Sequence, residues 1–182
     1  MKTNALKNWK LAALFFATFA VTSCDDDDDE IDLGRMSATE FVQRAAASDV
    51  FEITTGNMAN DKSENPAVKT FGLELVTDHT ASSNELMNIA KANNINVPMP
   101  TRETLPEDKK TIISRLEGKT GVAFDQDFAD VQEDAHEDAV ELYEDAVEDL
   151  DNGPLKDFAQ KTLPVLRKHL EHAKQLETQV GS

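Results

Sequence analysis

The sequence predicts an all-α fold, a four-helix bundle with a short extra helix in the connection between the second and third long helices. Three observations indicate this fold. Apolar residues recur at helical spacing in four long segments after residue 36. Polar or proline-containing turns separate these segments, and only one connection is long. Aromatic residues make up only 6% of the chain and β-branched runs are few, which disfavours a β-sandwich or barrel.

Each predicted helix has its own start or stop signal. Ser37-Ala-Thr-Glu40 has the form of a capping box, and Pro66 suits the first turn of the second helix. Gly118 ends the short helix as a C-terminal cap, and Asn152-Gly153-Pro154 stops one long helix and starts the next. These signals predict long helices over 38–59, 66–92, 122–150 and 155–178, and the short helix over 106–117.

The N-terminal segment has the features of a lipoprotein signal peptide. Three lysines and no acid precede a largely apolar run at residues 11–21. A membrane-spanning helix needs about 20 apolar residues, so this shorter run is typical of a signal peptide. Val21-Thr22-Ser23-Cys24 resembles the bacterial lipobox, and Cys24 is the one cysteine of the chain. We therefore predict a signal peptide over 1–23 and lipidation of Cys24, which anchors the mature chain to a membrane.

An acidic run directly follows the predicted lipidation site. Residues 25–30 are six consecutive acids, which repel one another and stay solvated. We predict that residues 24–36 form a disordered tether and that residues 37–182 form the bundle domain. The run also looks like the surface-export signal of Bacteroidetes-type lipoproteins. It predicts an outer-membrane lipoprotein displayed on the cell surface, and the alternative is a plain spacer on a lipoprotein of the periplasmic face.

The composition excludes several classes of function. The formal net charge of −17 is unsuited to nucleic-acid binding, which requires a basic face. A single cysteine excludes an internal disulfide, a CxxC redox pair and a cysteine-based zinc cage. The GxGxxG, P-loop and GxSxG motifs do not occur in the sequence. We therefore assign no catalytic residue and favour a non-enzymatic protein.

The third long helix is unusually acidic. Thirteen acids lie from Asp125 to Asp151, and no lysine or arginine lies between Lys119 and Lys156. Most of these acids fall away from the apolar stripe of the helix. We interpret them as a solvated outer face, and a cation-binding strip is the alternative.

Four ionisable residues fall on or beside the apolar faces, one on each long helix. A helical wheel of about 100° per residue places Glu52, His79, His136 and His169 there, with His172 toward the boundary of its face. Imidazole and carboxylate groups suit zinc, iron or copper, so these four are candidate ligands of a single transition metal. We favour a buried hydrogen-bond network over this metal site, because buried charges need partners. No other cofactor is expected.

Short stretches in a fixed order run through the predicted bundle. They are Phe51-Glu52-Ile53 with Met58-Ala59, Val68-Lys69-Thr70-Phe71, Leu75-Val76-Thr77-Asp78-His79, Gly121-Val122-Ala123-Phe124-Asp125, His136, Leu155-Lys156-Asp157-Phe158-Ala159, Leu163-Pro164 and His169-Leu170. Through these stretches, over about 37–178, the chain resembles the ferritin-like domain-of-unknown-function 4142 family of exported bacterial proteins. The resemblance implies a four-helix bundle in the cell envelope, from a family without an established general activity. It also implies recurrent polar positions at Glu52, Asp78, His79, Asp125, His136 and His169.

A ferritin-like fold raises the question of a di-iron site, which needs a Glu-x-x-His motif on two helices. The residue three positions before His79 is Val76, and the one three before His169 is Leu166. Only His136 has the motif, with Glu133, and the wheel puts Glu133 on the solvent side. A ferritin-type di-iron oxidase is therefore disfavoured.

Two functions of different classes remain. The first is a surface-exposed lipoprotein with a non-enzymatic envelope or interaction role, acting with a protein or cell-surface partner. The alternative is a metal-binding or oxidative-stress bundle that uses the interior cluster of Glu52 and three histidines.

Overall fold

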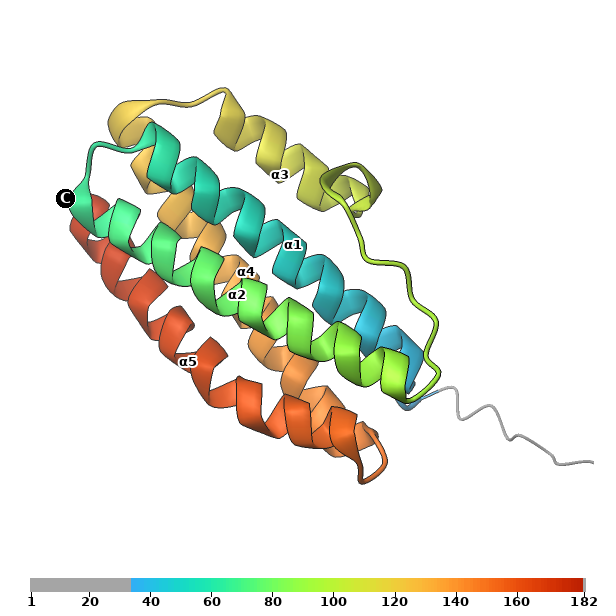
Figure 1. Ribbon diagram of the computed structural model, residues 1–182. Coiled ribbons are helices and arrows are strands. Elements are labelled where there is room, and N and C mark those ends of the chain that lie inside the picture. The colour runs from blue at the N-terminus through green and yellow to red at the C-terminus, as the bar shows by residue number, and fades with distance from the viewer. Residues whose placement is uncertain (1–33, 182) are drawn as a thin grey trace, which may run out of the picture. The chain divides into compact units, whose positions relative to one another are not determined.

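The computed structural model describes residues 34–181, which form five α-helices and one short 3-10 helix (Figure 1). The predicted signal peptide, Cys24 and the acidic run at 25–30 lie outside the described residues. The all-α fold and the extra helix are confirmed. The long helices are α1 (Ala38–Lys62), α2 (Pro66–Ala92), α4 (Gly121–Asp149) and α5 (Pro154–Val180), and the connection between α2 and α4 holds η1 (Arg102–Thr104) and α3 (Glu107–Glu117).

Local capping explains where the first two helices begin. The Ser37 hydroxyl accepts a hydrogen bond from the backbone N–H of Glu40 at 3.2 Å, as the sequence predicts. Asn65 caps α2 in the same manner, with Pro66 in the first turn. The helix α1 ends at Lys62, three residues beyond the predicted end at Ala59. Ser63 is its C-cap, and the Ser63 N–H donates to the backbone oxygen of Ala59.

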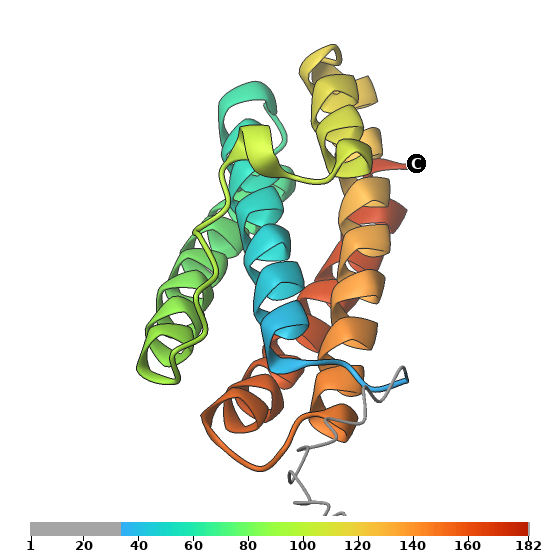
Figure 2. The same ribbon diagram turned by 90° about the vertical axis from the view of Figure 1, so that its right-hand side faces the viewer.

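The four long helices form a bundle, and α3 lies outside it along α1 and α4 (Figures 1 and 2). The helices α1 and α2 form one antiparallel hairpin, and α4 and α5 form the other. Across the bundle, α1 packs against α4 and α2 packs against α5. The long connection returns along the bundle, so α2 and α4 run in the same direction (Figure 1). A single long crossover is the connectivity of ferritin-like bundles.

The core of the bundle is divided along its length. One apolar cluster surrounds Phe41, Tyr143 and Phe158, and a second surrounds Phe71, Phe124 and Phe128. In each long helix, buried polar residues stand between the residues of the two clusters. These residues include Asp49, His79, His136 and His169, and these four, together with Glu52 and Gln132, which lie within about one turn of them on α1 and α4, form what we call the polar layer.

The closest approach between α1 and α2 depends on two glycines. A Cβ atom on Gly56 would lie 2.7 Å from the backbone oxygen of Gly72, and a Cβ on Gly72 would lie 2.7 Å from the oxygen of Gly56. Real Cβ atoms do not approach backbone oxygens this closely, so the contact requires glycine on both helices.

Most of the α4 acids are exposed, and several of them pair with α5. Arg167 lies 2.7 Å from Glu144, and Lys174 lies 2.9 Å from Glu137. Asp125 and Asp127 differ, because both are buried, and Asp127 pairs with Lys119 at 2.9 Å. The described residues contain no group of clustered metal-ligand atoms that includes an α4 acid, so the face is solvated and partly paired.

None of the helices within residues 34–181 combines the length and hydropathy needed to cross a membrane.

Candidate metal centre

Three of the four predicted ligands meet in the middle of the bundle. His79 lies midway along α2, His136 midway along α4 and His169 midway along α5. All three side chains are buried. One ring nitrogen of each lies within 4.8 Å of the corresponding nitrogens of the other two. We call this group the tri-histidine cluster.

The three rings are nearly equidistant. The ring centroids are 5.7 Å apart for His79 and His136, 5.5 Å for His79 and His169, and 5.4 Å for His136 and His169. Three imidazoles bound to one tetrahedral metal ion at about 2.0–2.1 Å have centroids about 5.2 Å apart. The three ring centroids therefore lie nearly as far apart as those of three imidazoles bound to one metal ion.

Each ring of the cluster is held through one nitrogen. An oxygen atom accepts from that nitrogen, so the nitrogen carries a ring hydrogen, and in a neutral ring the opposite nitrogen keeps its lone pair. The contacts are His79 Nδ1 to Asp49 Oδ1 at 2.8 Å, His136 Nδ1 to the backbone oxygen of Gln132 at 2.8 Å, and His169 Nε2 to Asp78 Oδ2 at 3.0 Å.

The opposite nitrogen of each ring has no hydrogen-bond partner among residues 34–181. These atoms are His79 Nε2, His136 Nε2 and His169 Nδ1. More than about 90% of buried polar groups in proteins have a partner. Three unpartnered lone pairs in one buried cluster form a set of donors suited to a cation.

Glu52 lies beside the cluster and is not part of the close group of nitrogens. One turn before it on α1, Asp49 contacts His79, and one turn after it, Thr55 accepts a hydrogen bond from Gln132 Nε2 at 3.0 Å. Glu52 is therefore on the α1 face that contacts α2 and α4. It is buried, and neither carboxylate oxygen has a partner of good hydrogen-bond geometry within the described part of the chain.

Burial controls the protonation of Glu52 and His136. Burial raises the pKa of Glu52 to about 7, although His79, Lys109 and the nearby Gln132 amide act to lower it. Burial, followed by the charges of His79 and His169, lowers the pKa of His136 to about 3. His136 is therefore a neutral ring near pH 7, which is the form that binds metals.

The other two histidines differ in the charges around them. Burial, followed by the charge of His79, lowers the pKa of His169. Burial also acts to lower the pKa of His79, but the hydrogen bond to Asp49 and the charge of Glu52 outweigh it and raise that pKa. Burial likewise raises the pKa of Asp49, although its hydrogen bond with His79 acts to lower it.

A second group of potential ligands lies on the outer side of His169. Oxygen atoms of Glu74 and Asp78 and a nitrogen of His169 lie within 4.8 Å of one another. Glu74 already accepts from Lys168 Nζ at 2.6 Å and from His172 Nδ1 at 2.9 Å. Burial acts to raise the pKa of Glu74, but these two contacts lower it. The carboxylate is therefore engaged, and this group supports His169 from outside.

Asp125 and Glu133 lie apart from the cluster. Asp125, one of the positions implied by the family resemblance, is buried near the start of α4. Glu133 is partly exposed and lies 3.8 Å from Lys174 Nζ, away from the three histidines. Because Glu133 is in neither group of clustered ligand atoms, the described residues do not contain the ferritin-type arrangement.

Asp49 and Gln132 are site residues that sequence reasoning missed. Asp49 precedes Glu52 by three positions and Gln132 precedes His136 by four, so each shares a helix face with a predicted ligand. Helical spacing could have placed both residues on the inward faces. Their contacts with His79 and His136 could be identified only once the packing of the helices and the side-chain geometry were known.

Comparison with known proteins identifies a family and two similar folds. The family model described as Domain of unknown function (DUF4142) matches residues 30–176. No curated protein matches the sequence.

The two similar solved structures share the fold at low sequence identity. A DUF305 protein from Streptomyces coelicolor is 12% identical with a TM-score of 0.68, and the match covers 80% of this chain and 94% of that one. CopM in its Cu(II)-bound form is 14% identical with a TM-score of 0.67, and the match covers 80% of this chain and 98% of that one.

Proposed function

This chain belongs to the family described as Domain of unknown function (DUF4142), and since that description names no activity, we propose a function from the tri-histidine cluster. The protein binds one divalent transition-metal ion through His79 Nε2, His136 Nε2 and His169 Nδ1. The observation that carries this proposal is the convergence of three buried ring nitrogens that have no partner among residues 34–181.

A hydrogen-bond network is the competing interpretation, and the orientation of the rings counts against it. Each ring contacts an oxygen atom through one nitrogen, and the other nitrogen of each ring has no partner within residues 34–181. A proton can be held only by His79, whose pKa is raised, because the pKa of His136 is about 3 and that of His169 is lowered. One proton on His79 would engage at most two of the three nitrogens. A cation at the centre would compensate all three lone pairs at once.

The surroundings of the cluster resemble the surroundings of known metal-bound histidines. Such histidines commonly donate their second nitrogen to a carboxylate or a backbone carbonyl, which fixes the ring and makes it a better ligand. Asp49, Asp78 and the Gln132 carbonyl occupy these positions. The buried carboxylate of Glu52 supplies negative charge beside the dication.

Imidazole ligands suit zinc, iron and copper, and divalent copper binds most tightly of these to a given nitrogen site. A bundle of similar fold carries Cu(II) in the CopM structure. We therefore propose Cu(II) as the first metal to test, with zinc and iron as the others.

The test is the metal content of the purified chain, prepared without a histidine tag and dialysed after exposure to each metal. We expect one ion per chain and a higher melting temperature with the metal. His136→Phe, which replaces one ring by an apolar ring, should abolish stoichiometric binding. His172→Gln is the matched control, because His172 is outside the tri-histidine cluster. A metal-free protein whose melting temperature does not respond to copper, zinc or iron would refute the proposal.

The sequence also supports a location for this protein. We propose that lipidation of Cys24 anchors it to the outer membrane and that the acidic run at 25–30 directs it to the cell surface. The support is the lipobox-like sequence and the position of the acids directly after it. The metal would then be bound outside the cytoplasm. The protein would contact a membrane through its lipid anchor, and its other partner would be a component of the cell surface.

A further inference from the structure

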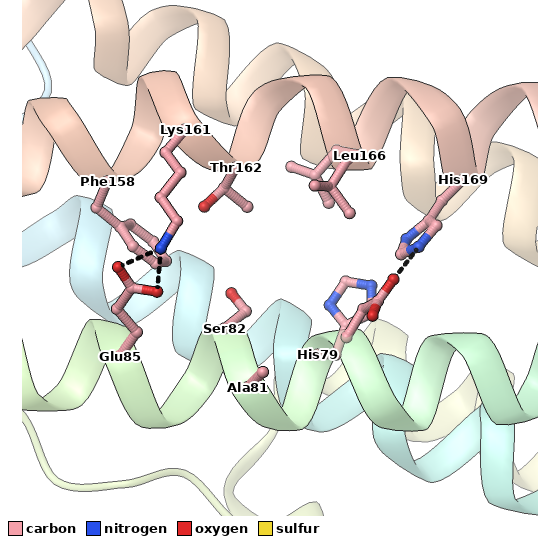
Figure 3. Close-up of a pocket in the computed structure, with 11 residues that line it drawn as sticks. His79, Ala81, Ser82, Glu85, Phe158, Lys161, Thr162, Leu166 and His169 are labelled. Carbon is pink, nitrogen blue, oxygen red and sulfur yellow. Dashed lines mark hydrogen bonds and ion pairs between the residues drawn. The ribbon is translucent and has the colours of Figure 1, made fainter.

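A cavity between α2 and α5 reaches the tri-histidine cluster. Its volume is about 250 Å³, and its walls include His79 and His169 (Figure 3). At about 30 Å³ for each water-sized group, it has room for roughly eight such groups. Two grooves beside α3 have walls that include none of the three histidines.

The cavity lies where it could give access to the fourth position of a metal. Three protein ligands leave one tetrahedral position for an outside ligand, which is the arrangement of reactive rather than purely structural metal sites. His79 and His169 are 3% and 1% exposed, and the unpartnered nitrogen of each has less than 1 Å² of accessible surface, so a molecule in the cavity reaches it only when the intervening side chains move. Glu52 belongs to α1, whereas the residues that line the cavity come from α2 and α5. Glu52 is also outside the close group of ring nitrogens.

The walls of the cavity indicate what kind of molecule fits it. Phe158, Val165 and Leu166 provide an apolar surface, and Ser82 and Thr162 add two hydroxyl groups (Figure 3). At the end away from the histidines, Lys161 of α5 pairs with Glu85 of α2 at 2.7 Å (Figure 3).

The charge of the walls disfavours an anion. Lys161 is neutralised by Glu85, and Asp78 adds a further carboxylate beside His169. The whole chain is also strongly acidic, with a formal net charge of −17. An anionic ligand would therefore meet a negative field as it entered.

We propose that this cavity binds a small neutral molecule that coordinates the metal through one nitrogen or oxygen lone pair. The inference rests on the proposed metal centre. The donor atom occupies the fourth position, and the rest of the molecule packs against the apolar wall formed by Phe158, Val165 and Leu166.

The experiment uses the purified chain loaded with Co(II), whose visible absorption bands report its ligands, and imidazole as the neutral probe. Imidazole should change the bands in a saturable manner, with one probe per cobalt and with the cobalt content unchanged. Ala81→Trp and Val165→Trp place a large side chain at the cavity from α2 and from α5. Each should weaken imidazole binding at least tenfold while keeping one cobalt per chain. Both residues are exposed, so the fold should tolerate the changes.

Leu73→Trp is the matched control, because Leu73 is an exposed residue of α2 that does not line the cavity. It should bind imidazole as the unmodified chain does. If the chain holds one cobalt and imidazole leaves the bands unchanged, the inference is wrong and the metal centre stands. If both cavity variants bind imidazole normally, the ligand enters elsewhere and the inference is also wrong. If the chain binds no cobalt, copper, zinc or iron, the proposed function fails and the inference fails with it.

Discussion

At the scale of single residues, the proposed centre depends on side chains that are not among its three proposed ligands. Asp49 is buried and contacts His79 Nδ1, so it fixes which nitrogen of that ring keeps a lone pair. The helical wheel gave the direction of the predicted ligands correctly, but a wheel contains no information about partners on other helices. For this reason the sequence could predict that three histidines point into the bundle, while the contacts that anchor their rings could not be predicted.

Asp49→Asn should weaken metal binding by about 10–100-fold without loss of the fold. The amide oxygen can still accept from His79, but the negative charge that strengthens the ring as a ligand is gone. Competition with a chelator measures the affinity. Asp61→Asn is the control, because Asp61 is an exposed acid of the same helix. Equal affinities for the two variants would show that Asp49 has no role in the centre.

Glu52→Gln should make the metal-free protein more stable at pH 8 and have little effect below pH 4.5. The ordinary pKa of this carboxyl is 4.5 and its folded value is about 7, so the folded state holds the proton more tightly than the unfolded state does. The charged form therefore costs stability, in full above pH 7 and progressively less as the pH falls to 4.5. The gain at pH 8 should be about 3 kcal/mol.

Urea unfolding of the two proteins in a chelator, at pH 8 and at pH 4.5, checks this prediction. Glu141→Gln, at an exposed position of α4, should show no such pH-dependent difference. A variant that is less stable than the unmodified chain at both pH values would mean that Glu52 has a stabilising partner when ionised.

At the scale of the helices, local sequence signals and contacts between helices determine different features. The boundaries of α2 and α3 follow from Pro66 and Gly118, which act within a few residues, and the sequence predicted them within one residue. The close approach at Gly56 and Gly72 depends on which helices become neighbours. No local pattern contains that information, so the role of these glycines was not predicted.

Gly72→Ala should destabilise the protein by about 1–2 kcal/mol, since the added methyl group must push α1 and α2 apart. Alanine favours the helical state by up to about 1 kcal/mol, and the overpacking outweighs this gain. The change in unfolding free energy measures it. Gly118→Ala is the control, because a Cβ there would come no closer than 3.6 Å to another atom and the backbone is already right-handed. Equal or higher stability of Gly72→Ala would show that the two helices can separate without cost.

At the scale of the whole molecule, the proposed metal centre and the acidic surface would both attract cations. The strongly negative chain attracts cations over distances of about a Debye length, and the cluster would retain them. The predicted lipid anchor and tether would hold this surface close to a membrane.

Cys24→Ala should abolish lipid labelling and release the protein from the membrane fraction, because no other cysteine is present to accept the lipid. Labelling with a radioactive or clickable fatty acid, followed by fractionation, measures both effects. A variant that still carries label and remains with the outer membrane would show that Cys24 is not the anchor.

Replacement of the acids at 25–30 by alanine should lower surface display and leave membrane attachment unchanged. Antibody labelling of intact cells gives the exposed fraction, and fractionation gives the attached one. Unchanged labelling of intact cells would identify the run as a plain spacer.

The polar layer between the two apolar clusters also restricts how the helices can align. A shift of one helix by a single turn, about 5.4 Å, would move its buried polar side chain out of the layer and against apolar side chains. His169 would then lose Asp78, or Asp49 would lose His79, and the stranded group would have no partner. An all-apolar interior would tolerate such slippage far better, since one leucine can replace another. The layer that could hold a metal can therefore also select one alignment of the helices from several that pack equally well.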